Sequence, residues 1–484
     1  MKRKSYLILL LLTFGALLLH GYHPFAEDAE IYVPGIVKVL HPAYYPTGQE
    51  FFETHAHLTL YPKLIAWTTW LTHLPLDWTL FLWHVATIFL LLMACWRIAA
   101  KCFPTEAGRW AAVGLAAALL TLPIAGTSLY ILDQYLNPRS FSAFAVLFAI
   151  DAALEKKYFR ATLWLIATAV IHPLMTVFGL AYIVILIVTD KMKMFQGASV
   201  TAALLPGIFS GQPSPAYWAS LRAHRYYYLL RWTWYEWLGI IGPLAILWWF
   251  SEIGRRKERP ELRRVARATF CFCAVFLAGG LAVTIPRTFE VLALYQPMRS
   301  LLIVYIFLAL LAGGLLGEAI LKHHALRWIL LFAPLCAGMW YAQLQLFPLE
   351  RHVEWPGTAP TNPWMQAFVW ARQNTPTDAN FALDPDYMAL PDESYQGFRA
   401  TAERSRMADG LKDWSAAALF PNLPFADDVQ KQVEALKGWK NFGASDFERL
   451  KQDYGVTWVV VEKAQASELT CPYENQLVKV CRVD

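Results

Sequence analysis

The chain has 484 residues, of which 57% are hydrophobic and 16% are charged, against roughly 25% charged in an ordinary soluble protein. Its net charge of +5 comes from basic residues scattered over short loops, which is not the pattern of a nucleic-acid-binding protein. Its cysteines show no CxxC, HExxH or Cys/His spacing, which argues against structural zinc. The composition is typical of a polytopic membrane protein.

The chain begins with Lys2-Arg3-Lys4, and an apolar run follows from Tyr6 to Leu19. A secretory signal peptide has a similar pattern. No small-residue cleavage site follows, because the run ends in His20-Gly21-Tyr22-His23-Pro24. We therefore expect an uncleaved first membrane helix.

A membrane-crossing helix needs about 20 mostly apolar residues, and on this basis we expect about eleven such helices. The expected spans are Tyr6–His20, Trp78–Ala99, Arg109–Ser128, Arg139–Leu154, Arg160–Ile171, Pro173–Thr189, Ala198–Ser210, Trp237–Ser251, Ala268–Ile285, Ser300–Ile320 and Trp328–Leu346.

Two segments depart from a simple span. The fifth and sixth spans meet at His172-Pro173, which indicates a broken helix or a re-entrant pair buried in protein. The segment Leu58–Leu74 carries Pro62, Lys63 and His73. We interpret it as a helix lying at the membrane interface.

The loop charges then give the orientation. With these spans, one set of alternate loops holds 20 Lys and Arg, and the opposite, longer loops hold eight. The positive-inside rule places the basic set, and with it the N-terminus, in the cytoplasm of a bacterial inner membrane. Eleven crossings then place the C-terminus in the extracytoplasmic compartment.

Residues 347–484 are polar and predict a small soluble α/β domain, outside a membrane bundle of residues 1–346 with an outer loop at 21–77. Asn362-Pro363 opens a helix, and a capping box at Ser445–Glu448 opens another that stops at Gly455. Buried strands are expected at Val456–Val461, Asn475–Val483 and Phe381–Asp384. Cys471 and Cys481 would meet an oxidising compartment, which favours a disulfide over two unpaired thiols.

The first outer loop holds three carboxylates within four residues, Glu27, Asp28 and Glu30. Crowded carboxylates raise one another's pKa or recruit a divalent cation. Either outcome suits a general base. The alternative is an ordinary acidic loop.

A second polar group follows the third span, with Asp133, Asn137 and Arg139 as candidate substrate-binding residues. Asn137-Pro138 initiates a turn, and Arg139 could hold a phosphate with two parallel hydrogen bonds. The alternative is an arginine that reaches lipid headgroups. His172 is a further candidate, because an ionisable residue within a membrane segment is by default functional. The alternative is a histidine bonded to backbone that Pro173 frees.

Two more basic segments are expected on the same side of the membrane. Residues 217–236 combine tyrosines and tryptophans with Arg225 and Arg231, and aromatic faces stack on sugar rings. Arg287 and Arg299 flank the loop between the ninth and tenth spans, where they could hold a lipid-linked phosphate. The alternatives are an amphipathic interfacial helix and two interface anchors.

At Glu27-Asp28-Ala29-Glu30 the chain resembles the GT-C class of integral-membrane glycosyltransferases. Those enzymes have many spans, an acidic motif in the first outer loop, interfacial helices after it and often a soluble C-terminal domain outside. The resemblance implies that Asp28 is the base or a ligand of Mg²⁺ or Mn²⁺, with Glu30 as its partner. The chain departs from the pattern in having Glu at the second acidic position. It also resembles uncharacterised bacterial membrane proteins of the same plan.

These features lead to two hypotheses. The first is an inverting glycosyltransferase that moves a sugar from a polyprenyl-phosphate donor to an envelope glycan, lipid or protein at the outer leaflet of the membrane. The second is a non-catalytic transporter or assembly protein for envelope polysaccharide. A transporter often shows internal repeats of its spans, and none is visible in this sequence.

Overall fold

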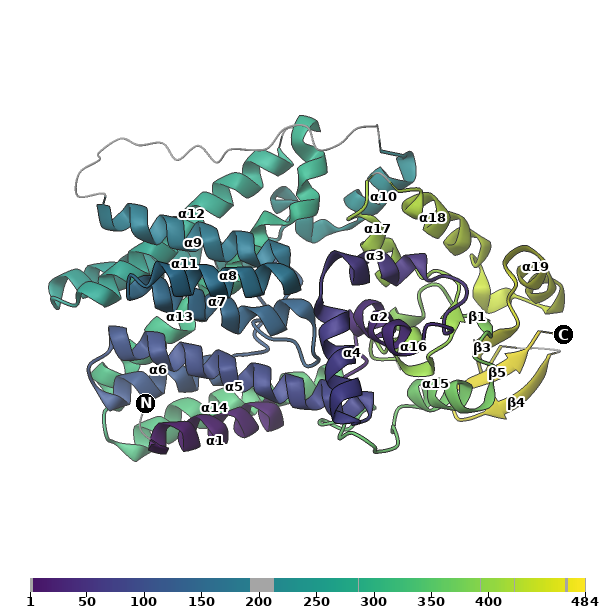
Figure 1. Cartoon of the computed structure of the whole chain (residues 1–484), viewed down its shortest axis with the longest axis horizontal. Coiled ribbons are helices and arrows are strands. Elements are labelled where there is room, and N and C mark those ends of the chain that lie inside the picture. Colours follow the sequence, from purple (N-terminus) through teal and green to yellow (C-terminus); the bar gives the residue numbers. More distant parts are fainter. Residues whose placement is uncertain are drawn as a thin grey trace. The chain divides into compact units, whose positions relative to one another are not determined.

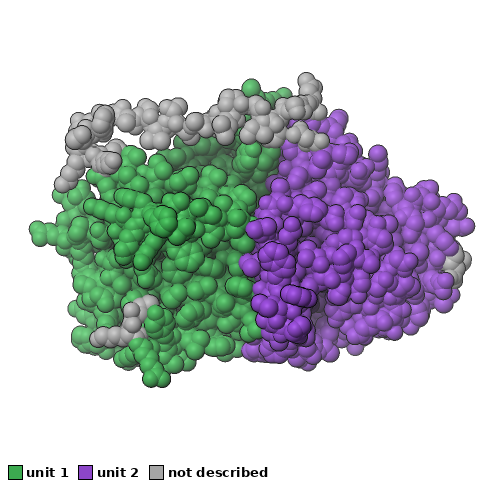
Figure 2. Space-filling model, in the orientation of Figure 1, with its two compact units in different colours: residues 1–21, 82–206, 225–343 green, residues 22–81, 207–224, 344–484 purple. Residues whose placement is uncertain are grey.

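The computed structural model describes residues 3–191, 213–285, 287–391, 393–421, 423–465 and 469–483. The chain divides into two compact units, coloured separately in Figure 2. Unit 1 comprises residues 1–21, 82–206 and 225–343. Unit 2 comprises residues 22–81, 207–224 and 344–484. The sequence predicted a simpler division after residue 346, whereas the first outer loop belongs with the C-terminal region in unit 2.

Unit 1 is a helical bundle (Figure 1). Its helices are α1 (Arg3–His20), α5 (Leu76–Cys102, which begins in unit 2), α6 (Glu106–Ala118), α7 (Pro138–Leu154), α8 (Tyr158–Ile171), α9 (Pro173–Lys191), α11 (Trp234–Arg256), α12 (Pro260–Thr284), α13 (Leu301–Leu316) and α14 (Ala325–Leu346). Short 3-10 helices η1 (Arg225–Tyr227), η2 (Leu229–Arg231), η3 (Arg287–Tyr295) and η4 (Pro297–Ser300) join them, and a π-helical turn η5 (Gly317–Leu321) follows α13.

Ten of the expected membrane spans fall on described residues, and a helix covers each of them wholly or in part. Within the described residues, seven helical segments are long and apolar enough to cross a membrane. The expected span Arg109–Ser128 is wrong in its second half, because α6 ends at Ala118 and the chain turns there. The expected span Ala198–Ser210 lies outside the described residues. The chain is therefore a multi-pass membrane protein.

The centre of unit 1 is formed by α7 and α13. Every residue of α7 is buried, including the polar side chains of Arg139 and Asp151, as expected for a helix at the centre of a bundle. On α9, the ring of Tyr182 stacks on Phe307 of α13 at 5.0 Å, and its hydroxyl bonds Thr269 of α12 at 2.8 Å. At the other end of α7, Asp151 accepts from Arg97 of α5 at 2.7 Å. These contacts fix the helices that carry the polar residues of unit 1.

Unit 2 combines helices from both ends of the chain. Its helices are α2 (Ala29–Leu40), α3 (Glu50–Leu58), α4 (Tyr61–Thr72), α10 (Pro215–Ala223), α15 (Pro363–Asn374), α16 (Phe398–Ala402), α17 (Lys412–Ala417), α18 (Phe425–Ala435) and α19 (Ala444–Tyr454), with 3-10 helices η6 (Tyr387–Ala389) and η7 (Trp439–Asn441). The helix expected at the membrane interface is α4, which exposes Trp67, Trp70 and Leu71 by 63%, 71% and 74%. Such an aromatic face is typical of an interfacial helix.

The sheet of unit 2 has five strands in the order β2-β1-β3-β5-β4. They are β1 (Asn380–Ala382), β2 (Ser405–Arg406), β3 (Trp458–Glu462), β4 (Thr470–Glu474) and β5 (Val478–Arg482). β1 pairs with β2 and β3 in parallel, whereas β5 pairs with β3 and β4 in antiparallel orientation. The three strands expected from the sequence correspond to β1, β3 and β5, and the mainly helical fold with a small C-terminal sheet is confirmed.

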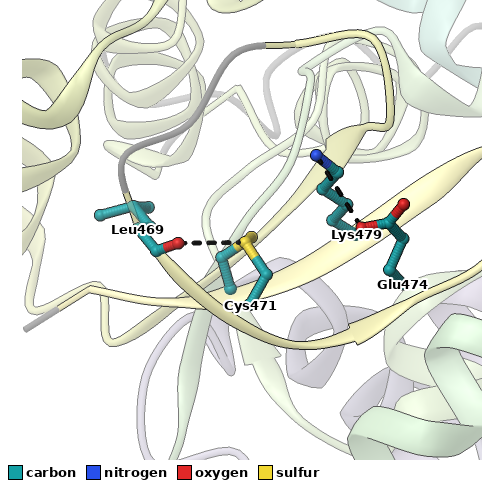
Figure 3. Close-up of a disulfide and its surroundings, with 5 residues drawn as sticks. Leu469, Cys471, Glu474 and Lys479 are labelled. Carbon is teal, nitrogen blue, oxygen red and sulfur yellow. Dashed lines mark hydrogen bonds and ion pairs between the residues drawn. A yellow bond between two sulfur atoms is a disulfide. The ribbon is translucent and has the colours of Figure 1, made fainter.

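Cys471 of β4 and Cys481 of β5 form a disulfide between neighbouring strands (Figure 3). Cys481 is fully buried in a hydrophobic core of unit 2 that also contains Val459 and Val461. The Lys479–Glu474 pair lies along the same strands, with 4.0 Å between Nζ and Oε2. The bond therefore ties the edge strand β4 to the sheet.

Breaking this disulfide is expected to destabilise unit 2. Cys471→Ser combined with Cys481→Ser removes a constraint on the unfolded chain, which in small loops is worth about 2–4 kcal/mol. Denaturant unfolding of the detergent-solubilised protein, with and without reductant, measures this. Reductant should lower the wild-type midpoint to that of the double variant and leave the double variant unchanged.

Candidate active site

The acidic loop ends at the first turn of α2. Asp28 occupies the N-cap position, and Glu27 before it has a positive φ of 56°. Negative side chains are favourable at a helix N-terminus because they face the positive end of the helix dipole. Successive helical residues point about 100° apart, so side chains two positions apart do not face each other. Asp28 and Glu30 consequently point to different surroundings.

Glu30 points into the interior of unit 2 and is fully buried. Its carboxylate accepts from Arg406 Nε at 2.9 Å and from the backbone N–H of Ala400 at 3.1 Å. Arg399 Nη1 lies 3.6 Å from Oε1 of Glu30. Burial raises the pKa of Glu30, and the two arginines only partly offset this. This placement fits a structural carboxylate, in contrast to the catalytic and metal-binding roles expected from the sequence.

Glu30 belongs to a buried charge cluster, defined here as Glu30, Arg399, Arg406, Asp409 and Asp413. Arg399 donates to both oxygens of Asp413 at 2.9 Å, and Arg406 also donates to Asp409. All five residues are at most 3% exposed. Burial by itself would lower the pKa of Arg406, but the surrounding Tyr387 and carboxylates raise it well above its usual value. The cluster therefore holds α2 against the segment from α16 to α17.

Glu27 and Asp28 lie at the edge of this cluster, and both accept from the ammonium group of Lys412. Lys412 Nζ donates to Glu27 and to Asp28, the latter at 2.9 Å. The side chain of Lys412 is 10% exposed, whereas those of Glu27 and Asp28 are 37% and 30% exposed. Burial alone would lower the pKa of Lys412, but the two carboxylates outweigh it and raise that pKa. Lys412 is thus a permanently charged anchor that orients two carboxylates still accessible to solvent.

The structure adds His55 of α3 to this site, which sequence reasoning did not single out. Burial lowers the pKa of His55 to about 4, although the charge of Asp28 acts in the opposite direction, so the ring is neutral at physiological pH. The rings of Tyr32 and Phe420 pack edge-to-face against the His55 ring, with ring centroids 6.3 and 5.3 Å from its own. A Glu53–His57 run in the first outer loop was the only signal available in the sequence.

In unit 1, Asp133, Asn137 and Arg139 form one buried network. Asp133 Oδ2 accepts from Arg139 Nη2, from Asn137 Nδ2 at 2.6 Å and from Ser140 Oγ at 3.1 Å. Asn137 Oδ1 caps α7 by accepting from the Ser140 N–H at 2.8 Å. The three candidates are therefore brought together as expected, but their contacts to one another build the N-terminus of α7.

His172 and Arg299 lie near that network. His172 separates α8 from α9 with an extended backbone, and its Nδ1 accepts from the Met175 N–H at 3.3 Å. Arg139 and Arg299 are both within electrostatic reach of His172. Arg299 lies over the ring of Tyr226 at 5.7 Å. Among the described residues, its buried Nε has no hydrogen-bond acceptor.

The other basic candidates of unit 1 are exposed. Arg225 donates to the Arg231 carbonyl at 2.8 Å and pairs with Glu236. Arg231 lies over the ring of Tyr228 at 4.5 Å. Arg287 is exposed at the start of η3. These contacts are typical of interface anchors.

The carboxylates near α2 do not fit a divalent cation. Both oxygens of Glu30 already accept from Arg406 and Ala400, and an ammonium group sits where Glu27 and Asp28 converge. Mg²⁺ and Mn²⁺ prefer several oxygen ligands without a competing cation. Over the described ranges, no group of three or more His, Cys, Asp and Glu side chains is arranged to hold a metal.

A second set of carboxyl groups is buried elsewhere in unit 2. Glu393 is fully buried, and its Oε2 accepts from the Gln396 N–H at 3.0 Å. Burial raises the pKa of Glu393 well above its usual value, and Glu350 nearby raises it further. Burial likewise raises the pKa of Glu350. In the folded chain these carboxyl groups retain protons that the unfolded chain has already lost.

This difference predicts a pH dependence. A carboxyl group whose pKa is raised on folding stabilises the fold below its unfolded pKa, and that contribution is lost as pH rises through its folded pKa. The melting temperature is therefore expected to fall as pH rises above the unfolded pKa of a glutamate, about 4.3. Glu393→Gln should flatten this slope, and Glu448→Gln, an exposed change on α19, should not. A slope equally steep in Glu393→Gln would contradict the assignment.

Comparison with known proteins gives a structural resemblance but no family match. A scan against family models finds no match, and a search of curated proteins finds none. A search of solved structures finds the archaeal oligosaccharyltransferase AglB from Archaeoglobus fulgidus in complex with an inhibitory peptide and a dolichol-phosphate, a GT-C protein. The two share 13% sequence identity and a TM-score of 0.39, over 95% of this chain and 69% of that one. At this TM-score the activity has to be argued from the residues themselves.

Proposed function

We propose that the protein is a membrane glycosyltransferase that moves a sugar from a polyprenyl-phosphate donor to an envelope glycan, lipid or protein. In the reaction, an acceptor hydroxyl attacks the anomeric carbon from the face opposite the phosphate. The new C–O bond forms as the bond to the phosphate oxygen breaks, and polyprenyl phosphate leaves with the electron pair. The configuration of the anomeric carbon is inverted.

The placement of Asp28 carries this proposal. Its carboxylate is oriented by Lys412 at 2.9 Å and remains 30% exposed, as a group that must reach a substrate hydroxyl requires. A positioned carboxylate that removes a proton typically contributes a factor of about 10²–10⁴ to the rate. The neutral ring of His55 is a second proton acceptor within electrostatic reach of Asp28. Glu27 also accepts from the ammonium group of Lys412, and we propose that it positions this group.

For the leaving group we propose Arg299, with His172 beside it. A guanidinium group with an unsatisfied buried N–H can stabilise a phosphate through charge-assisted hydrogen bonds. Arg139 already donates to Asp133, so we propose that it adds charge without direct contact. Asp133 and Asn137 then position Arg139, and Arg225, Arg231 and Arg287 act at the membrane surface.

Arg299→Gln is expected to raise KM for the polyprenyl-phosphate donor about tenfold or more, since a hydrogen bond to a charged group is worth about 1.5–3 kcal/mol. Arg287→Gln is the matched control, because Arg287 is exposed in the neighbouring 3-10 helix. Initial rates in proteoliposomes at varied donor concentration measure the effect. Equal KM values for the two variants would exclude Arg299 from phosphate binding.

The activity itself is tested with purified protein in liposomes that contain a radiolabelled polyprenyl-phosphate sugar and a cell-envelope extract. Label should move to an acceptor, and NMR of the product should show an inverted anomeric centre. The second candidate function is a non-catalytic transporter or assembly protein for envelope polysaccharide. The pairing of Glu27 and Asp28 with Lys412 favours it, because such a pairing can be purely structural. Export of the labelled lipid without any bond cleavage would support that candidate.

We propose that the protein lies in a bacterial inner membrane, with its N-terminus in the cytoplasm and residues 347–484 outside. The loop charges and the Cys471–Cys481 disulfide support this orientation. A reporter fused after residue 484 that is active only in the extracytoplasmic compartment tests it. Reporter activity only in the cytoplasm would reverse the orientation and remove the active site from the outer leaflet.

A further inference from the structure

Three helices of unit 1, α1, α6 and α14, enclose a groove of about 750 Å³. Its lining is almost wholly apolar: Ile8, Leu11, Leu12, Gly15, Ala16, Leu18 and Leu19 from α1, Trp110, Gly114, Ala117 and Ala118 from α6, and Trp328, Ile329, Phe332, Ala333, Cys336 and Trp340 from α14. This volume is within the range of roughly 300–1,000 Å³ that is typical of ligand sites.

Protein side chains leave this groove open. A Cβ atom added at Gly15 would meet nothing within 4 Å, so the α1 wall faces empty space there. Of the 22 residues of α14, only Gln343 is buried, although the helix is long and apolar enough to cross the membrane. Water in an apolar groove within the hydrocarbon layer would lack hydrogen-bond partners. A hydrocarbon chain is the filling that this lining favours.

The two ends of the groove differ in character. Trp110 and Trp328 lie near the starts of α6 and α14, and Trp340 lies near the end of α14, as aromatic residues do at the two membrane interfaces. Cations gather where the three helices begin: Arg3 and Lys4 on α1, Arg109 on α6 and Arg327 on α14.

These cations outnumber the carboxylates in the same first turns, where Glu106 of α6 is present. Two backbone carbonyls, those of Phe103 and Pro104, hold the guanidinium of Arg109, each at 2.9 Å. Basic side chains beside a groove between membrane helices are the usual recognition elements for anionic lipid headgroups.

We infer that this groove binds one anionic phospholipid, with its acyl chain between α1, α6 and α14 and its headgroup phosphate among Arg3, Lys4, Arg109 and Arg327. The lipid stabilises α14, which otherwise has few buried residues. This site is separate from the acidic site of unit 2, and it does not depend on the proposed transfer reaction.

The test is native mass spectrometry of the full-length protein in detergent, titrated with phosphatidylglycerol or with phosphatidylcholine of the same chains. One phosphatidylglycerol should bind the wild type, about tenfold more tightly than phosphatidylcholine. Gly15→Phe should weaken this binding at least tenfold, because the ring fills the groove. Gly338→Phe is the matched control, since Gly338 is exposed on α14, has open space at its Cβ and does not line the groove.

Two further variants keep the inference falsifiable if Gly15→Phe does not fold. Leu11→Trp enlarges a lining side chain that is 64% exposed, so it disturbs no packing and should also displace the lipid. Arg327→Gln should weaken phosphatidylglycerol binding about fivefold and leave phosphatidylcholine unchanged. Equal binding of the two lipids, or retention of the lipid in Leu11→Trp, would overturn the inference.

Discussion

Asp28→Asn is expected to lower the turnover number by a factor of about 10²–10⁴, because an amide cannot take the proton of the acceptor hydroxyl. The protein should still fold, since Asp28 is 30% exposed and its amide keeps an oxygen that can accept from Lys412. Single-turnover transfer in proteoliposomes, together with the melting temperature, measures both effects.

Glu27→Gln is the matched control, because Glu27 bonds the same ammonium and is similarly exposed. It should lower turnover far less than Asp28→Asn does. A residual activity in Asp28→Asn that falls further in Asp28→Asn/His55→Ala would assign the remaining proton transfer to His55. Undiminished turnover in Asp28→Asn would contradict the catalytic proposal and favour an assembly role.

Arg406→Met is expected to destabilise the protein by about 3–5 kcal/mol, the usual cost of removing one partner from a buried ion pair. Three buried carboxylates, those of Glu30, Asp409 and Asp413, would then face Arg399 as their remaining buried partner within the cluster. Denaturant unfolding followed by limited proteolysis of unit 2 measures the loss.

Arg372→Met is the control for this change. Arg372 also pairs with a carboxylate, Glu403 at 3.4 Å, but its side chain is 36% exposed. Exposed pairs contribute about 0–1 kcal/mol, so the control should unfold close to the wild type. If the two variants unfold at the same denaturant concentration, the buried charge cluster does not hold α2 in place.

The sequence alone was sufficient for features that depend on neighbouring residues. Apolar runs of membrane length predicted the helices of unit 1, because a helix in lipid must satisfy its own backbone hydrogen bonds. Asn362 before Pro363 predicted the start of α15, and its side chain does accept from the Trp364 N–H at 2.8 Å. Gly455 predicted the end of α19, and its φ is +66°. The predicted start of α19 was wrong: the N-cap is Gly443, whose N–H donates to Asp446, and not Ser445.

Only the tertiary structure decided which acidic residue faces solvent and which is buried. Glu27, Asp28 and Glu30 look alike in sequence, but their partners Lys412, Arg399 and Arg406 lie more than 360 residues later in the chain. Local patterns carry no information about contacts at that separation, because they arise from packing between distant segments. The sequence thus determined that this loop is acidic. The tertiary structure decided which carboxylate is structural, because it buries Glu30 against Arg399 and Arg406.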